Sequence, residues 1–588
     1  MSLTSHALKP GASPQQPDFC SAKPHEPSPS SNEEWATNSL PASSCGPAKA
    51  RLRVAMLLDR RSVPQWNFSL AMEIKRSLVL ELVPVFLNRV PASDRHQRRS
   101  LSDGGSLLFR LWNKLDRQLC NPDIDVLQLR EFDDSLSPAE CLEISVSNNG
   151  AGPYLSESEL AKLRRAALDV ILLFCNQVSV EPISQCARYG AWILGNSGSN
   201  AGNGRIFWAM CENNPLCEAS LKVVCNDLSR EHVIHHSFYA THPYSLFHNQ
   251  NAAYAKAADY LKRHLLNLHQ FGWDYVIQPR NEFDKQDWPE ANSKLPSNQT
   301  MAWFLPRWFI KAATQHARKR FFREQWFIAW RKKPLGTASW KDMQNFQLLL
   351  PPQDRFYADP FLFEKDDRNF IFVEDYKLNT KRGGISCIEV NPDGSLGEPE
   401  TVLELDTHIS YPNIFESEGQ IYLLPDTLEK RQIQLYRAVN FPRQWTLEKV
   451  LIDEISAVDP TLFEHNGKFW LFAANPQNDE LYLFYSHSLF GKWNEHPRNP
   501  IVSDVRRARP AGHVFFEDGR IIRPGQDCSR RYGYSVSLNE VQVLSETEYA
   551  EAPIGIIEPT WIEKNQGTHT FNQNSSYQVV DGRFLVRR

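Results

Sequence analysis

Five residues that each precede a proline are the first candidates for chemistry in this sequence. They are Asp359, Tyr411, Asp459, Arg509 and Glu558, and their prolines recur at intervals of 52, 48, 50 and 49 residues. Cleavage of a glycosidic bond needs two carboxyl groups about 5 to 9.5 Å apart across the bond. We therefore take Asp359, Asp459 and Glu558 as candidate catalytic residues. The alternative is that the residue before proline only caps a turn at the start of each repeat.

The repeat around these prolines predicts the fold that would bring the five residues together. Each copy has a proline, an apolar pair, an acidic residue, a turn and an aromatic strand, as in VDPTLFEHNGKFWLFAA from Val458. A period of about 40–50 residues with several strands per copy is typical of propeller blades. We predict an all-β five-bladed propeller over residues 325–588, with the copy at Pro559 as the fifth. The innermost strands line the axis, so the pre-proline residues should converge at one end of it.

Arginines gather in the fourth copy of the repeat. A guanidinium binds phosphate or carboxylate through two parallel hydrogen bonds, so this cluster favours an anionic sugar or a sugar phosphate as ligand. The alternative is a set of solvated or interblade ion pairs with Glu517, Asp518 and Asp527. The candidate substrate-binding residues are Tyr411, Arg509, Arg523, Asp527, Arg530, Arg531 and His569.

Cofactors are only weakly indicated. His569, in the late strand GTHTFN, is a candidate for holding an axial cation, and a packing histidine is the alternative. The Gly-rich loop 195–204 could cradle a phosphate, but it lacks the lysine of a P-loop and the spacing of a dinucleotide fingerprint. No other cofactor or metal is implied.

The chain before the propeller divides into three segments. Residues 1–50 contain 18 Ser or Pro and are predicted to be a disordered tail. Residues 51–275 alternate apolar runs such as LRVAMLLD with helical stretches, which predicts βαβ units in a Rossmann-like α/β domain. Residues 276–324 are predicted to be a linker and a basic amphipathic helix. The helical pattern, over 301–326, indicates either a connector between domains or a peripheral membrane contact.

Composition narrows the class of protein. The 588 residues carry a formal net charge of -4, which argues against a nucleic-acid partner. No apolar run approaches the roughly 18 residues of a transmembrane segment. The 11 cysteines form no C-x-x-C pair and no secretion signal is recognised, so we expect reduced thiols and a cytoplasmic location.

The propeller repeats carry a family resemblance. YADPFLFEKDDRNFIFVEDY and RRARPAGHVFFEDGRIIRPGQDCSRRYG resemble the β-propeller domain of glucosamine inositolphosphorylceramide transferases. That domain is similar to the five-bladed propellers of arabinanase- and xylosidase-type glycoside hydrolases. The resemblance implies a general base at Asp359 and an orienting carboxylate at Asp459. The general-acid glutamate that it implies on the fourth blade is replaced by Arg509, which leaves Glu558 and Glu374 as acid candidates.

A second resemblance concerns the first domain. ARYGAWILGNSGSNAGNGRIFWAMCENNPLCEASLKV, over 187–223, resembles the formyltransferase fold, whose enzymes use an Asn, a His and an Asp. Only Asn196 matches, since the loop has no His and the context of Asp227 differs. Three hypotheses follow for the protein. They are glycosyl transfer or hydrolysis of an anionic sugar at the propeller axis, formyl or acyl transfer by the first domain, and a non-catalytic glycan-binding scaffold.

Overall fold

The computed structural model describes residues 50–588 except 90–104, 121–124, 133–140, 149–152, 176–177, 196–199, 226–230, 279–292, 335–338 and 478. Asn196, Asp227 and the predicted tail up to residue 49 lie outside the described residues. Formyl transfer therefore stays a prediction. Within the described residues, no helix is long and apolar enough to cross a membrane.

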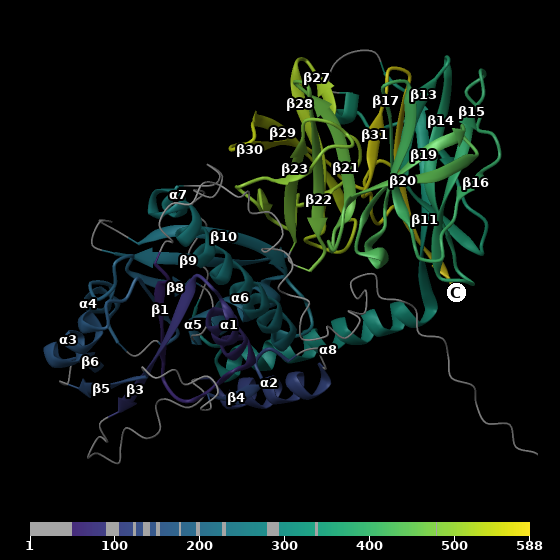
Figure 1. The fold of residues 1–588 in the computed structure, drawn as a ribbon. Helices are drawn as coiled ribbons and strands as arrows, with labels where there is room; N and C mark the ends of the chain where they lie inside the picture. The colour runs from purple at the N-terminus through teal and green to yellow at the C-terminus, as the bar shows by residue number, and fades with distance from the viewer. Residues whose placement is uncertain are drawn as a thin grey trace, which may run out of the picture. The chain divides into compact units, whose positions relative to one another are not determined.

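The first part of the chain is a sheet with helices, as the alternating pattern predicts (Figure 1), but the sheet is mixed, whereas βαβ units alone would give a parallel one. Its strand order is β10-β9-β8-β7-β1-β3-β5-β6, and β1 pairs in parallel with both β3 and β7. Strand β9 runs antiparallel to β8 and to β10. The strands are β1 Leu52–Leu58, β3 Leu80–Arg89, β5 Leu142–Asn148, β6 Pro153–Leu155, β7 Val170–Leu173, β8 Ala191–Leu194, β9 Leu216–Val224 and β10 His232–Ala240, with a separate pair of β2 Ser62–Pro64 and β4 Leu129–Glu131.

Strand β1 shows why these strands are continuously apolar. Val54 and Met56 pack into one hydrophobic core, whereas Ala55 and Leu57 pack into another, because successive side chains point to opposite faces of the sheet. A parallel sheet covered on both faces needs this composition. The helices of this part are α1 Gln65–Arg76, α2 Leu107–Leu119, α3 Glu157–Arg165, α4 Val180–Ser184, α5 Asn200–Glu212, α6 Leu246–Phe271 and α7 Trp273–Ile277.

Helix α8, Asn298–Phe321, begins where the side chain of Ser297 accepts a hydrogen bond from the Thr300 amide. The helix was expected to continue to Trp326 but ends at Phe321. The next residues form β11, Phe322–Lys332, which pairs with β32 along its whole length. Ladder hydrogen bonds to a long partner strand thus replace the helical ones from Phe322 onward.

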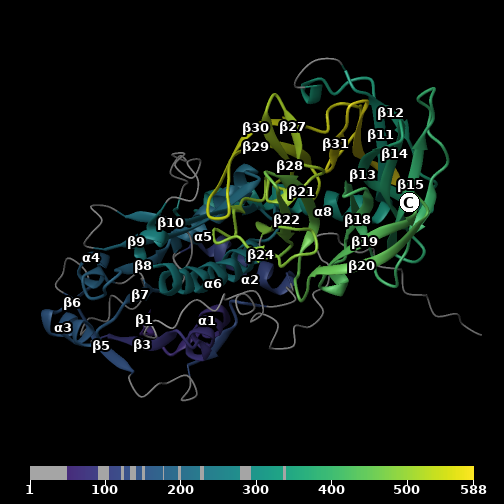
Figure 2. The same ribbon diagram turned by 45° about the horizontal axis from the view of Figure 1, so that its top comes forward.

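The second part is a five-bladed propeller, as the repeat predicts (Figure 2). Each blade is a sheet of four or five strands, and the first strands contact one another around the ring. The first blade consists of β13 Arg355–Lys365, β14 Arg368–Lys377, β15 Arg382–Val390 and β16 Glu400–Leu403, and the second of β17 Ser410–Ser417, β18 Gln420–Asp426, β19 Ile433–Asn440 and β20 Gln444–Ile452. The third consists of β21 Val458–His465, β22 Lys468–Asn475, β23 Glu480–Ser486, β24 Asn494–Glu495 and β25 Val502–Ser503. The fourth consists of β26 Arg509–Pro510, β27 Phe515–Glu517, β28 Arg520–Asp527, β29 Ser535–Leu544 and β30 Tyr549–Ile557.

The fifth blade is built differently from the prediction. Its order is β12-β11-β32-β31, so its outer strands precede the first blade in sequence and its inner strands follow the fourth. These strands are β31 Phe571–Gln573, β32 Tyr577–Arg587, β11 and β12 Gln347–Leu349. The assignment of the fifth copy to Pro559 is therefore wrong. Pro559 follows β30, the outermost strand of the fourth blade, and the inner strand of the fifth blade is β31.

Candidate active site

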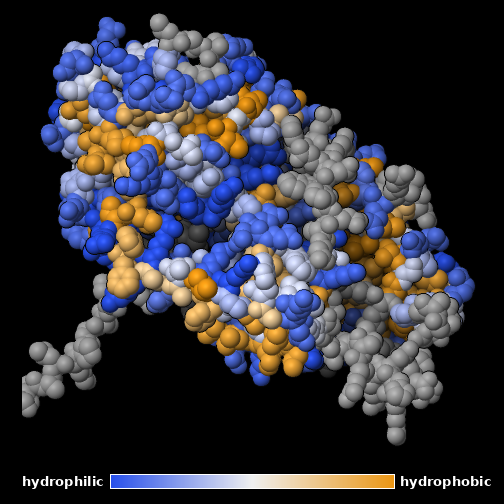
Figure 3. Space-filling model, turned by 180° about the vertical axis from the view of Figure 1, so that it is seen from behind, coloured by the Kyte–Doolittle hydropathy of each residue, from blue (hydrophilic) through white to orange (hydrophobic). Residues whose placement is uncertain are grey.

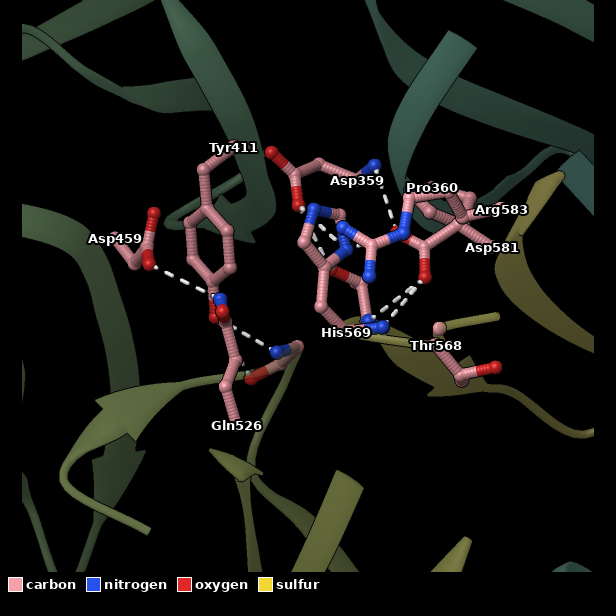
Figure 4. A network of polar contacts seen from close by, with 12 residues as sticks. Asp359, Pro360, Tyr411, Asp459, Gln526, Thr568, His569, Asp581 and Arg583 are labelled. Atoms are coloured by element: carbon pink, nitrogen blue, oxygen red, sulfur yellow. Dashed lines mark hydrogen bonds and ion pairs between the residues drawn. The ribbon is translucent and has the colours of Figure 1, made fainter. Parts of the chain in front are cut away.

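The residues that precede proline on the first three inner strands share an unusual backbone. Asp359, Tyr411 and Asp459 have φ values of 49°, 49° and 54°, and each lies at a break in the register between its strand and the next one. This left-handed conformation is uncommon for residues other than glycine and is further restricted before proline. Such bulges re-aim a side chain, and here the three side chains gather at one place (Figure 4).

Two carboxylates from second strands hold these bulges in place. Asp581 Oδ2 accepts a hydrogen bond from the Asp359 amide at 3.2 Å, and Asp426 Oδ2 accepts one from the Asp459 amide at 3.3 Å. The other oxygen of Asp581 accepts from the His569 amide at 2.7 Å. Each carboxylate comes from the blade before the bulge that it anchors, so it also ties neighbouring blades together.

Asp359 is buried and only partly neutralised. Its Oδ1 accepts a hydrogen bond from Thr570 Oγ1 at 2.7 Å and lies 3.7 Å from His569 Nδ1. Burial raises the pKa of Asp359 to about 6. The ring of His569 stacks on Trp326 with centroids 4.1 Å apart, and its Nδ1 pairs with Asp581. Although burial alone would lower it, the two carboxylates raise the pKa of His569.

Asp459 is paired, and so is the arginine predicted to bind the ligand. Arg509 Nε forms an ion pair with Asp459 Oδ2, and its Nη2 lies 3.4 Å from Oδ1. Gln526 Nε2 donates to the same carboxylate at 3.2 Å. Tyr411 is also engaged, because its hydroxyl accepts from the Gly512 amide at 2.7 Å. Arg509, predicted to bind the ligand, is therefore already paired with Asp459 in this structure, and its role in ligand binding stays a prediction.

Glu374 joins the axial group from the second strand of the first blade. It pairs with Ala358 across β13 and β14, beside the bulge at Asp359. Burial, followed by the charges of Asp359 and Asp426, raises its pKa well above the usual value. His408 Nε2 lies 3.7 Å from its Oε1. Burial and the charge of Asp459 also raise the pKa of Asp426, to about 7. Asp426 and Asp581 were missed in the sequence, and Glu374 was only a secondary acid candidate.

Three predicted site residues lie elsewhere. Glu558 is exposed and follows the outermost strand β30, so it does not reach the axis. Arg523 is fully buried in the fourth blade, where it makes two hydrogen bonds of 2.7 Å to Glu551. Asp527 Oδ1 accepts a hydrogen bond from the Ser529 amide at 2.9 Å. Arg523 is thus ion-paired, but with Glu551 of its own blade and not with Glu517, Asp518 or Asp527.

Arg531 belongs to a second group of cations. Its Nε donates to the carbonyl of Gln566 at 2.7 Å, and Arg318 Nη2 donates to the side chain of the same glutamine at 3.3 Å. Burial and the charges of Arg583 and Arg318 lower the pKa of Arg531 to about 10. Arg583 pairs with Glu324 at 2.9 Å, but its buried Nε and Nη2 have no hydrogen-bond partner among the described residues. Among the described residues, Glu324 is thus the carboxylate that pairs with this group, through Arg583, whereas Arg530 is exposed beside Tyr534.

A metal ion would have to compete with an existing contact. Oxygen or nitrogen atoms of Asp359, His569 and Asp581 lie within 4.8 Å of one another. However, His569 Nδ1 and Asp581 Oδ2 already pair, and Asp581 Oδ1 accepts two backbone amides. Binding of a cation here would require His569 to give up the proton that it shares with Asp581.

Comparison with known proteins supports the resemblance of the propeller. Residues 350–583 match the family model described as glucosamine inositolphosphorylceramide transferase 1, N-terminal. The relative of that name from Oryza sativa subsp. japonica is 38% identical over 241 residues, which are 39% of this chain and 32% of the relative. The one from Arabidopsis thaliana is 37% identical over 208 residues, covering 34% and 27%. The chain thus spans about a third of the length of these curated relatives.

Two solved structures are similar to the propeller at a low level. RS223-β-xylosidase has a TM-score of 0.31 and 10% identity, covering 39% of this chain and 93% of the enzyme. An exo-1,5-α-L-arabinanase from a bovine ruminal metagenomic library has a TM-score of 0.29 and 12% identity, covering 40% and 95%.

Proposed function

We propose that the propeller axis binds a phosphorylated or otherwise anionic sugar and carries out glycosyl transfer or hydrolysis on it. The observation that carries this proposal is the pair of buried carboxyl groups, Asp359 and Glu374, whose raised pKa values differ in degree. Titratable groups whose environments shift their pKa values apart are suited to act as acid and base. The names of the curated relatives, transferases for glucosamine and inositolphosphorylceramide, support a sugar and a phosphate-bearing ligand.

The pKa directions assign the two roles. Glu374, whose pKa burial raises well above its usual value, is suited to donate a proton to the oxygen that leaves the anomeric carbon as the glycosidic bond breaks. Asp359, with a pKa of about 6, is ionised at pH 7 and would accept the proton of the attacking hydroxyl or water as the new bond forms. Asp459, held by Arg509, would orient the sugar rather than exchange protons. This assignment replaces Glu558 as the acid.

The second group of cations would bind the phosphate. Arg531 and Arg318 are half-buried, so an anion can approach them from solvent, and within the described part of the chain no carboxylate forms an ion pair with either. A phosphate oxygen would relieve the repulsion among the three guanidinium groups and supply acceptors for their N–H groups. This cluster therefore takes the role first given to Arg509.

Calorimetry and a turnover assay test the proposal on the full chain. The probes are glucose 6-phosphate, glucuronate and glucose for binding, and p-nitrophenyl glucosaminide for turnover. Glu374→Gln and Asp359→Asn should each lower turnover at least about a hundredfold with little change in affinity, because general acids and bases act in the transition state. Arg531→Gln should weaken binding of glucose 6-phosphate but not glucose, whereas the neighbouring Arg530→Gln should change neither.

A scaffold that binds glycans without catalysis is the second candidate. It is favoured by the engagement of Tyr411, Asp459 and Arg509 with other protein groups. Binding of the sugar probes with no turnover in any variant would select this candidate. Absence of binding in the unmodified chain would reject both functions for the axial site.

A further inference from the structure

Helices α2 and α8 lie side by side and share one buried face. The indole of Trp112 contacts the ring of Phe304, with centroids 5.2 Å apart, and that of Trp308 at 6.1 Å. The Leu108 amide donates to Asn298 Oδ1 at 3.0 Å. Phe109 and Trp112 of α2 and Met301 and Phe304 of α8 supply the buried side of this pair.

The other side of α2 is also apolar but faces solvent. Leu107, Leu111, Leu115 and Leu119 are 57%, 58%, 45% and 69% exposed. Residues four apart lie on one stripe of a helix, so the four leucines form a continuous apolar line. Figure 3 shows hydrophobic side chains gathered at the lower edge of the molecule, where α2 lies in Figure 1. A soluble helix normally exposes polar residues there.

Helix α8 adds exposed aromatic and aliphatic side chains. Trp303, Phe309 and Ile310 are 52%, 67% and 62% exposed. Together with the four leucines of α2 they form what we call the apolar patch. Large apolar side chains exposed together on adjacent helices often mark a binding surface.

The charges on the two helices have one sign. Arg110, Lys114 and Arg117 are exposed on α2, and Arg307 is exposed on α8 beside Trp303. The 24 residues of α8 contain no Asp or Glu. The one acid of α2, Asp116, is buried and accepts a hydrogen bond from the Phe247 amide at 2.8 Å. The exposed surface of the pair is therefore apolar and cationic.

We propose that the apolar patch docks on a membrane surface that contains anionic lipids. Helices with Leu, Trp and Phe on one side and Lys or Arg beside them lie in the interface between lipid headgroups and acyl chains. Anionic headgroups attract each basic residue near the surface. A second copy of the chain is a poorer occupant, because a two-fold symmetric contact would place these basic residues against themselves. The expectation of a membrane contact through 301–326 alone is thereby extended to α2.

Vesicle flotation of the full chain tests this inference without any sugar ligand, so its result is independent of the proposed function. The unmodified chain should float with vesicles of phosphatidylcholine mixed with phosphatidylserine, less with phosphatidylcholine alone, and less again at high salt. Arg307→Gln or Lys114→Gln should each reduce binding to the mixed vesicles about fivefold, which corresponds to about 1 kcal/mol per basic residue. Leu111→Asn combined with Ile310→Asn should reduce it at least about tenfold.

Matched controls separate docking through the apolar patch from nonspecific hydrophobic binding to vesicles. Val439→Asn changes a 61% exposed apolar residue on β19 of the propeller and should leave flotation unchanged. All changed residues are exposed, so thermal melting should stay constant and report intact folding. Equal flotation of the double variant, or no flotation of the unmodified chain, would overturn the proposal. A concentration-dependent dimer that the double variant abolishes, without lipid binding, would instead identify a second copy as the occupant.

Discussion

Replacement of Asp359 by asparagine should stabilise the propeller while it removes turnover. Burial raises the pKa of Asp359 from 3.8 to about 6. One pKa unit corresponds to about 1.4 kcal/mol, so the ionised carboxylate costs the folded state about 3 kcal/mol above pH 6. The raised pKa favours folding below about pH 4, and this contribution is lost as the pH rises through about 6. An asparagine side chain at this position would be neutral throughout and would avoid that loss.

The substitution is suited to isolate the charge. Asparagine tolerates the left-handed backbone that Asp359 adopts, and its side-chain oxygen can still accept from Thr570. Loss of the attraction to His569 will offset part of the gain, which we therefore expect to be about 1–3 kcal/mol at pH 8 and near zero at pH 4. For a domain of this size about 1 kcal/mol corresponds to 2–4 °C in Tm. Melting curves of the full chain at both pH values measure it.

Asp459→Asn is the control and should lower the stability of the propeller, whereas Asp359→Asn should raise it. Asp459 has the same bulge and almost the same φ, but Arg509 pairs with it. Leaving the partly buried Arg509 without its carboxylate should cost about 1–3 kcal/mol at neutral pH. If both residues only cap turns, both substitutions should lower Tm by similar amounts at either pH. A fall in Tm of Asp359→Asn at pH 8 would refute the reasoning for a strained functional carboxylate.

Two further substitutions test the packing that positions the axis. Gly512 has φ 127°, and a Cβ there would lie 2.2 Å from the carbonyl oxygen of Phe571. Gly512→Ala should therefore lower the free energy of unfolding, measured in denaturant melts, by about 3 kcal/mol or more. The control Gly419→Ala, with φ 72° and open space around it, should lower it by only about 1–2 kcal/mol. Arg523→Met should lower the free energy of unfolding by about 3–5 kcal/mol because it leaves the buried Glu551 carboxylate without its partner. The double variant Arg523→Met with Glu551→Met should recover most of that loss.

The sequence predicts the first four blades well and fails at the fifth for a topological reason. Four copies of the repeat are contiguous, so each one carries its own inner strand and proline. The fifth blade combines β31 and β32 with β11 and β12 from the other end of the propeller. No single stretch of sequence contains that blade, and Pro559 offered a spacing close to the true period. The THTFN segment, which does hold the inner strand, lacks the proline that identified the other copies.

At the axis, residue position was predictable and pairing was not. The repeat correctly identified Asp359, Tyr411 and Asp459 as equivalent positions. It also contained acidic residues on the second strands, since Glu374 lies on β14 and Asp426 ends β18, whereas Asp581 lies in the middle of β32. The partners of the arginines, by contrast, come from strands far along the chain, as Asp459 does for Arg509 and Glu551 for Arg523. Hydropathy and spacing carry no information about such pairs.

The pairing changes which residues are suited to chemistry. With Arg509 paired to Asp459, the axial carboxyl groups of the described residues whose pKa burial raises are Asp359, Glu374 and Asp426. Asp426 accepts hydrogen bonds from the Leu428 and Asp459 amides, so it holds the bulge at Asp459 in place. This is why the proposed function assigns proton transfer to Asp359 and Glu374. Arg509, the cation that the fourth blade contributes to the axis, holds Asp459, so in the proposed function the anionic group of the ligand would be bound by Arg531 and its neighbours.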